Sequence, residues 1–251
     1  MKKRRLKKKN IANLFLIVFL GLFIYSSIHI FNWYKDNKYT KNQLKVVKEK
    51  AEVKFTKDED GKNLNVNFDE LIKANEETVA WINIPGTLID YSVLKHDDNS
   101  YYLNHSFDKT YNGSGWIYAD YNTDLDNLTY NNVIYGHSMI NRTMFGSLRD
   151  VLKNKYLEST DDYYIYLSTP KYNYIFQIFS SYHIEPTDDY IKTNLTKEEF
   201  EEWLEMIKNR NIINYKTEVT KEDKILTLST CYSDSERMAV HAKLISKKIR
   251  H

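Results

Sequence analysis

The residue best suited to chemistry is the only cysteine of the 251-residue chain, Cys231, which ends the apolar, strand-like run of residues 224–231. The N-terminal segment described below predicts export, and exported proteins usually carry cysteines in pairs or not at all. An unpaired thiol outside the cell is exposed to oxidation, so we expect it to be retained for its reactivity. A cysteine nucleophile reacts as the thiolate and needs an imidazole or another cation beside it.

Seven histidines compete for the role of that base. His137 ends residues 131–137, directly after Gly136, which permits a tight turn of the backbone. Reactive side chains are often placed at the ends of elements in a rigid scaffold. His241 instead lies inside the last predicted strand, on the face opposite its apolar residues. We therefore predict that His137 is the partner of Cys231. The other five are His29, His96, His105, His183 and His251.

Acyl transfer also needs a group that stabilises the developing oxyanion. Arg237 begins the strand that follows Cys231, across the short loop of residues 232–236. If the two strands pair antiparallel, Arg237 lies beside the thiol. A surface arginine without a role is the alternative, and backbone N–H groups near Cys231 could also serve.

Eight strand-like runs predict a sandwich or barrel, because they are short, closely spaced and rich in Ile, Val, Tyr and Thr. They are residues 80–84, 88–94, 115–119, 131–135, 163–167, 172–184, 224–231 and 237–245. A capping box at Thr196 and Glu199, followed by apolar residues at helical spacing, predicts an amphipathic helix over 196–209. Residues 67–75 predict a shorter helix capped by Asn67.

The first 31 residues predict a membrane anchor. Seven basic residues lie within residues 1–10, and residues 11–31 carry no charge. At about 1.5 Å per helical residue this run is roughly 30 Å long, the thickness of a bilayer core. Trp33 and Tyr34 suit the headgroup region. A cleaved signal peptide is the alternative, but the end of the apolar run offers no clear cleavage site.

The anchor defines four segments. We expect a cytoplasmic basic segment at 1–10 and a single-pass transmembrane signal-anchor at 11–31. An extracellular, solvated stalk at 32–66 and a catalytic domain at 67–251 follow. Without the seven N-terminal basic residues, the 36 Lys and Arg fall to 29, against 34 Asp and Glu. The exported part is thus mildly acidic, which argues against nucleic acid as a partner.

Three ordered motifs resemble those of the sortase family. Thr-Leu-Ser-Thr-Cys at 227–231, with Arg237 opening the next strand, resembles the signature around the sortase cysteine. Tyr-Gly-His at 135–137, followed by residues 143–148, resembles the histidine segment, and residues 81–87 resemble an early sortase strand. The predicted helices resemble those of class B members. The resemblance covers roughly residues 67–245.

The resemblance implies a mostly β fold: an eight-stranded sortase-type β-barrel with an N-terminal helix and an inserted helix, preceded by a single transmembrane helix. It implies a cysteine transpeptidase on the extracellular face of a Gram-positive cell membrane, which cleaves the C-terminal sorting signal of secreted surface proteins after threonine. Cys231 would form the thioacyl-enzyme, and His137 would act as general acid and base. Arg237 would hold the substrate backbone or the oxyanion. An amine of a peptidoglycan precursor or pilin would release the acyl group.

Five further residues are carried over as substrate-binding candidates. Tyr135, Ser229 and Thr230 flank the catalytic positions, whereas Tyr190 and Ile191 match the class B substrate-groove segment. We expect no cofactor and no metal, because the only paired acids near that segment, at 188–189, are typical of a solvated turn. The sorting motif, of the Asn-Pro-x-Thr-Asn or the Pro-x-Thr-Gly type, stays open.

Two other functions use the same residues. A cysteine protease would resolve the thioester with water rather than an amine. A non-catalytic, anchored wall-binding β-module would keep Cys231 buried and inert, since a free cysteine often behaves as a small core residue.

Overall fold

The computed structural model describes residues 2–58, 61–159 and 163–250. The chain divides into two compact units, residues 1–42 and residues 43–251. Helix α1 (Lys2–Ala51) forms the first unit and continues into the second. Within the described chain, residues 11–51 hold one helix that is long and apolar enough to cross a membrane.

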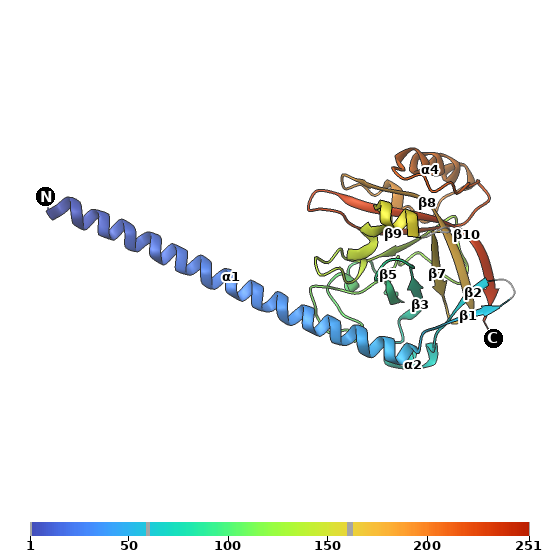
Figure 1. Cartoon of the computed structure of the whole chain (residues 1–251), viewed down its shortest axis with the longest axis horizontal. Coiled ribbons are helices and arrows are strands. Elements are labelled where there is room, and N and C mark those ends of the chain that lie inside the picture. The colour runs from blue at the N-terminus through green and yellow to red at the C-terminus, as the bar shows by residue number, and fades with distance from the viewer. Residues whose placement is uncertain (1, 59–60, 160–162, 251) are drawn as a thin grey trace. The chain divides into compact units, whose positions relative to one another are not determined.

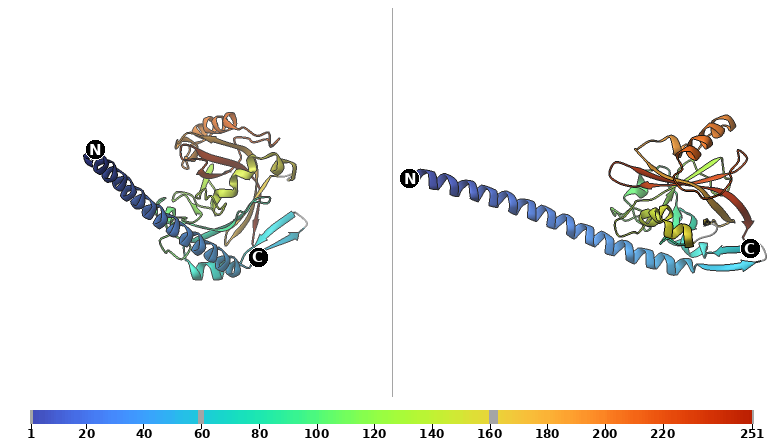
Figure 2. Two further views of the ribbon diagram at one scale, coloured as in Figure 1. Left: turned by 60° about the vertical axis from the view of Figure 1, so that its left-hand side comes forward. Right: turned by 45° about the horizontal axis from the view of Figure 1, so that its top comes forward.

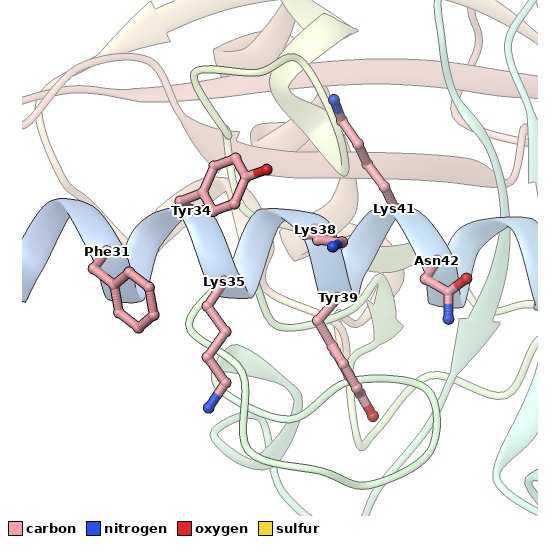
Figure 3. Close-up of a pocket in the computed structure, with 7 residues that line it drawn as sticks. All are labelled: Phe31, Tyr34, Lys35, Lys38, Tyr39, Lys41 and Asn42. Atoms are coloured by element: carbon pink, nitrogen blue, oxygen red, sulfur yellow. The ribbon is translucent and has the colours of Figure 1, made fainter.

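Mostly aromatic and basic side chains lie at the end of the apolar run of α1 and just after it. They line a pocket along this helix together with Asn42: Phe31, Tyr34, Lys35, Lys38, Tyr39 and Lys41 (Figure 3). Aromatic rings and the long stems of lysines suit the boundary between a bilayer and water. The pocket belongs wholly to the first unit and contains no residue predicted to do chemistry.

Eight strands close into a barrel in the order β10-β8-β7-β3-β4-β5-β6-β9. Figure 1 shows this barrel with helix α4 (Lys197–Arg210) beside it. Their bounds are β3 (Thr78–Asn83), β4 (Asp90–Leu94), β5 (Tyr118–Ala119), β6 (Asn131–Tyr135), β7 (Tyr164–Ser168), β8 (Tyr172–Ile184), β9 (Ile225–Cys231) and β10 (Arg237–Ile249). The eight strand-like runs of the sequence therefore correspond one to one with the barrel strands, and the predicted fold class is confirmed.

The barrel interior is a single apolar core. It includes Trp81, Val93, Phe176, Leu226 and Val240, all of them buried. Leu226 and Leu228 point inward from β9, so the alternating residues of that strand face the other side of the barrel wall. That alternation decides which β9 side chains are available for a site outside the core.

Helix α4 (Lys197–Arg210) covers the outer side of the barrel wall beside β8, β9 and β10 (Figures 1 and 2). The Thr196 hydroxyl accepts from the Glu199 N–H and the Glu199 side chain accepts from the Thr196 N–H, so the predicted capping box begins the helix. Its predicted apolar stripe is buried in a second cluster: Phe200, Trp203, Leu204 and Ile207. Burying each of these side chains stabilises the fold by roughly 1.5–3 kcal/mol.

Residues 43–66, which the sequence analysis placed in a solvated stalk, belong to the barrel unit. The end of α1 buries Val47 and Ala51, and the hairpin of β1 (Lys54–Asp58) and β2 (Gly61–Asn65) buries Leu64. Helix α2 (Phe68–Ala74) follows, with the Asn67 cap as predicted. The polar, Lys-rich composition concealed these contacts, because a few apolar residues suffice to bind a segment whose other side chains stay in water.

Four short helices complete the described chain. They are η1 (Tyr101–Leu103), η2 (Phe145–Leu152), α3 (Asn154–Ser159) and η3 (Asp189–Ile191). Two of them matter for function, because η1 contacts the segment after β6 and η3 contacts β6 and β9.

Candidate active site

Three neighbouring strands bring Cys231, His137 and Arg237 to one end of the barrel wall. Strand β9 lies between β6, which runs parallel to it, and β10, which runs antiparallel. Arg237 is the direct partner of Cys231 in the β9–β10 register, as the antiparallel expectation required. In the β6–β9 register Tyr135 pairs with Ser229, so His137 and Cys231 each lie two residues beyond a paired position. The Gly136 N–H donates to the Ser229 carbonyl at 3.2 Å, so the chain still follows β9 at the residue before His137.

Cys231 is half-buried and is the last residue of its strand. The residues before it on β9 are all buried, and Cys231 lies outside both core clusters. It is therefore anchored by its strand but accessible at its side chain. This placement differs from the buried, inert cysteine that a non-catalytic module would need.

The ring of His137 is oriented by a backbone carbonyl. Its Nε2 lies 2.8 Å from the carbonyl oxygen of Leu103 in η1. A carbonyl can only accept, so Nε2 carries the proton in this arrangement. Nδ1 has no hydrogen-bond partner among the described residues, and it is the nitrogen left to exchange protons. No sequence pattern points to Leu103, because the contact is made by a backbone carbonyl and any residue supplies one.

Gly136 is required by space rather than by an unusual backbone angle. A Cβ on this residue would lie 2.4 Å from Cδ1 of Ile117 and 2.9 Å from Cδ2 of Phe145. The Phe145 N–H also donates to the His137 carbonyl at 2.9 Å. The sequence suggested a tight turn at Gly136; what the structure shows there instead is the close approach of two apolar side chains.

The loop that follows His137 is strained. Arg142 and Met144 have positive φ angles of 67° and 52°, although neither is glycine. Such conformations cost of order 1–3 kcal/mol each and cluster at functional sites. A bridge between Ser138 and Met144 closes the loop. The rest of the fold therefore offsets this conformational cost and keeps the loop after His137 in one conformation.

Two of the five predicted substrate-binding residues, Tyr190 and Ser229, meet on the outer side of β9. The Tyr190 hydroxyl lies 2.9 Å from Oγ of Ser229, and both side chains are buried. Burial raises the pKa of Tyr190, so its hydroxyl stays protonated near neutral pH. Arg237 and Cys231 act electrostatically on the same hydroxyl. These four residues therefore form one neighbourhood.

The segment that carries Tyr190 is fixed from two sides. Asn131 Nδ2 donates to the carbonyls of Tyr190 and Lys192 at 3.3 and 2.9 Å. Arg210 donates two hydrogen bonds of 2.7 Å to the Asp189 carboxylate, and these hydrogen bonds lower the pKa of Asp189. Asp189 was expected in a solvated turn; instead it ties η3 to the end of α4.

The other three candidates have separate environments. The Tyr135 hydroxyl donates to Asp120 at 2.9 Å. Ile191 packs at the edge of the α4 cluster. Thr230 is buried, and its hydroxyl has no hydrogen-bond partner within the part of the chain that the structure describes.

A cluster of side chains that no sequence motif indicates fixes the residue after the cysteine. The Tyr232 ring stacks on His183 at 4.2 Å between centroids, and the Arg149 guanidinium lies 5.1 Å from the ring centre. Arg149 donates to the Tyr232 carbonyl and, at 3.1 Å, to Oγ of Ser138. His183 also bonds Glu236 at 2.8 Å. The short loop after Cys231 is therefore held from β8 and from η2, two elements distant in sequence.

A second histidine beside β9 is locked into the wall. His241 on β10 is fully buried; its Nδ1 lies 2.9 Å from Oγ1 of Thr227 and its Nε2 lies 3.1 Å from the Tyr182 hydroxyl. Thr227 donates onward to Asn131, so its oxygen accepts from His241 Nδ1–H, and His241 Nε2 accepts from Tyr182. Burial lowers the pKa of His241 to about 3. His241 is a neutral structural residue.

No cluster of metal ligands is found in residues 2–58, 61–159 and 163–250: three or more His, Cys, Asp or Glu side chains do not converge there. The chemistry available at the end of β9 is that of a thiol, an imidazole and a guanidinium. Those groups suit acyl transfer through a thioester.

Comparison with known proteins agrees with this geometry. A family model described as the sortase domain matches residues 82–245. A sortase B of Staphylococcus aureus is 32% identical over 241 residues, covering 94% of this chain and 96% of the relative. A crystal structure of sortase B from B. anthracis in complex with AAEK1 matches with a TM-score of 0.74 at 29% identity, covering 85% and 99% of the two chains. A sortase B complexed with triglycine matches with a TM-score of 0.67 at 34% identity, covering 72% and 86%.

Proposed function

The chain belongs to the sortase family and is a cysteine transpeptidase most similar to class B members, and we propose that it cleaves the C-terminal sorting signal of secreted surface proteins after threonine. The acyl group is then transferred to an amine of a peptidoglycan precursor or pilin. The observation that carries this proposal is the end of β9, where an accessible Cys231 lies beside Arg237 and one strand away from His137.

In the first step the Cys231 thiolate attacks the carbonyl carbon of the threonine. The C–N bond of the sorting signal breaks, and His137 protonates the leaving amine. In the second step the acceptor amine attacks the thioester, the C–S bond breaks, and the proton lost by the amine passes to His137. Because His137 Nε2–H is committed to the Leu103 carbonyl, Nδ1 carries both proton transfers.

Arg237 supplies positive charge beside the reacting carbonyl. Its position opposite Cys231 suits a hydrogen bond to the oxyanion or to the substrate backbone. In this proposal the sorting signal lies along Tyr190, Ile191 and Ser229, and the hydrogen bond between Tyr190 and Ser229 beside Cys231 supports that placement. Tyr135 is held on β6 by its hydrogen bond to Asp120, whereas Thr230 alternates with Ser229 and lies on the core side of β9 with Leu228.

Residues 11–31 anchor the enzyme in the cell membrane with the basic residues 1–10 in the cytoplasm. The apolar helix and the aromatic and basic side chains that follow it support this topology. The catalytic domain then acts at the extracellular face, where the sorting signals of secreted proteins are delivered.

The test is cleavage of peptides of the Asn-Pro-x-Thr-Asn and Pro-x-Thr-Gly types by the wild type and by Cys231→Ala, with and without an added amine. We expect Cys231→Ala to lower turnover by more than about 10³-fold, whereas Ser233→Ala, in the exposed part of the same loop, stays near wild type. Unchanged turnover in Cys231→Ala would refute the proposal. Hydrolysis alone under saturating amine would favour the cysteine protease.

A further inference from the structure

A cavity of about 530 Å³ adjoins the residues that follow both His137 and Cys231. Ser138 and Tyr232 line it, so the cavity meets the catalytic segments one residue beyond the imidazole and one residue beyond the thiol. The rest of its lining comes from the strained loop after His137 and from η2. Neither Tyr190 nor Ser229 lines it.

The cavity is basic. Arg142, Arg149 and Lys153 line it together with one carboxylate, Asp150, which pairs with both Arg142 and Lys153. Three cations against one carboxylate leave a net charge of +2. Arg149 forms no ion pair with any described residue and bonds neutral oxygens, those of Ser138 and Tyr232. Its guanidinium charge is therefore open to an anion that enters the cavity.

The hydrogen bonds of Arg149 also hold its guanidinium near the two catalytic segments. It holds the Tyr232 carbonyl, which belongs to the residue bonded to Cys231, and it holds Ser138, which is bonded to His137. A peptide residue spans at most about 3.6 Å. An acceptor with its amine at the thioester and an anionic group one to three residues away would place that group among these cations.

We propose that this cavity binds an anionic oxygen group, carboxylate or phosphate, of the acceptor amine, with the guanidinium of Arg149 and the charges of Arg142 and Lys153 as its partners. This inference rests on the proposed transpeptidase function. Guanidinium groups bind carboxylate and phosphate oxygens with paired, charge-assisted hydrogen bonds. The cavity thus selects acceptors for the second step, separately from the residues proposed above to bind the sorting signal in the first.

The experiment compares three acceptors with the full-length wild-type enzyme at low and high salt: triglycine, triglycinamide, and a triglycine analogue whose carboxylate is replaced by phosphonate. We expect the KM for a charged acceptor to be about fivefold lower than for triglycinamide, with the advantage shrinking as ionic strength rises. The stronger of the two charged acceptors identifies the anion. Equal KM values for all three would overturn the inference.

Two variants localise the effect. The KM ratio between amide and charged acceptor should fall toward one in Arg142→Ala/Lys153→Ala and stay at the wild-type value in Lys208→Ala, whose lysine lies on α4 and pairs with Glu205. An unchanged ratio in the double variant would contradict the assignment to this cavity. If the double variant fails to fold, the comparison of the three acceptors with the wild type still decides whether an anionic group on the acceptor is recognised.

Peptide cleavage without any acceptor separates the two proposals. If the wild type cleaves the sorting peptide but does not distinguish the acceptors, only the cavity assignment fails. If cleavage itself is absent, the proposed function fails.

Discussion

Two histidines flank strand β9, and they differ in how fully the fold occupies their ring nitrogens. His241, on the β10 side, uses both nitrogens inside a buried chain of hydrogen bonds with Thr227 and Tyr182. His137, on the β6 side, commits Nε2 to a backbone carbonyl and leaves Nδ1 without a described partner. The first histidine stabilises the wall, and the second is equipped to move protons. Beside the middle of β9 the histidine is therefore fully hydrogen-bonded, whereas beside the end of β9 the histidine keeps one ring nitrogen available.

The largest expected difference between these regions is in turnover. His137→Ala should lower the rate of sorting-peptide cleavage by about 10²–10⁴-fold, because general acid–base catalysis is lost, and it should change the melting temperature little, because the ring is only half-buried. Steady-state kinetics and thermal unfolding measure the two effects. A loss below tenfold would remove His137 from the mechanism.

The reverse pattern is expected for His241. His241→Ala leaves a cavity in the wall, removes one hydrogen-bond partner from each of Thr227 and Tyr182, and should lower the free energy of unfolding by about 2–5 kcal/mol. Turnover per folded molecule should stay within about threefold of wild type. Ile245→Ala, at an exposed position of the same strand, serves as the control. A His241 variant of normal stability but greatly reduced turnover would make the two histidines alike and break the comparison.

Low pH should reduce the stability of the protein through the protonation of His241. Its pKa is about 3 in the fold and about 6.5 in an unfolded chain, so between these values the unfolded state binds the extra proton. The stabilisation is complete above pH 6.5 and is lost as pH falls toward 3. From urea unfolding at pH 7 and pH 5, we expect the wild type to lose roughly 2 kcal/mol more than His241→Gln. Equal losses in the two proteins would show that His241 is not buried in its neutral form.

A smaller effect should follow from a steric clash at Gly136, the residue before His137. Gly136→Ala puts a Cβ against Ile117 and Phe145 and should cost about 1–3 kcal/mol of stability while displacing His137. The second substitution Ile117→Val removes the atom of closest approach and should restore part of both stability and turnover. No rescue by Ile117→Val would mean that the clash is not the cause.

The sequence predicted the parts of the fold that depend on local pattern. The runs 131–135 and 172–184 match β6 and β8 at both ends, and the capping box begins α4 one residue after Thr196. By contrast, Gly115–Ala119 contains only the two-residue strand β5, because most of that run is irregular chain with Gly115 at a positive φ of 57°.

Contacts between distant segments could not be predicted in the same way. The register that brings Arg237 opposite Cys231 needed only an antiparallel pair, and the motifs suggested it. The Leu103 carbonyl and the Arg149 guanidinium reach the site across 34 and 83 residues of sequence, respectively. Neither lies in a periodic pattern or motif, so only the folded chain reveals them.

The most direct test of the catalytic role of Cys231 is the mass of the enzyme after brief incubation with a sorting peptide and no amine acceptor. We predict that part of the wild-type protein gains the mass of the acyl fragment ending in threonine, that proteolytic mapping places the adduct on Cys231, and that added triglycine removes it. An adduct on another residue, or cleavage of the peptide by Cys231→Ala at the wild-type rate, would contradict a mechanism through Cys231.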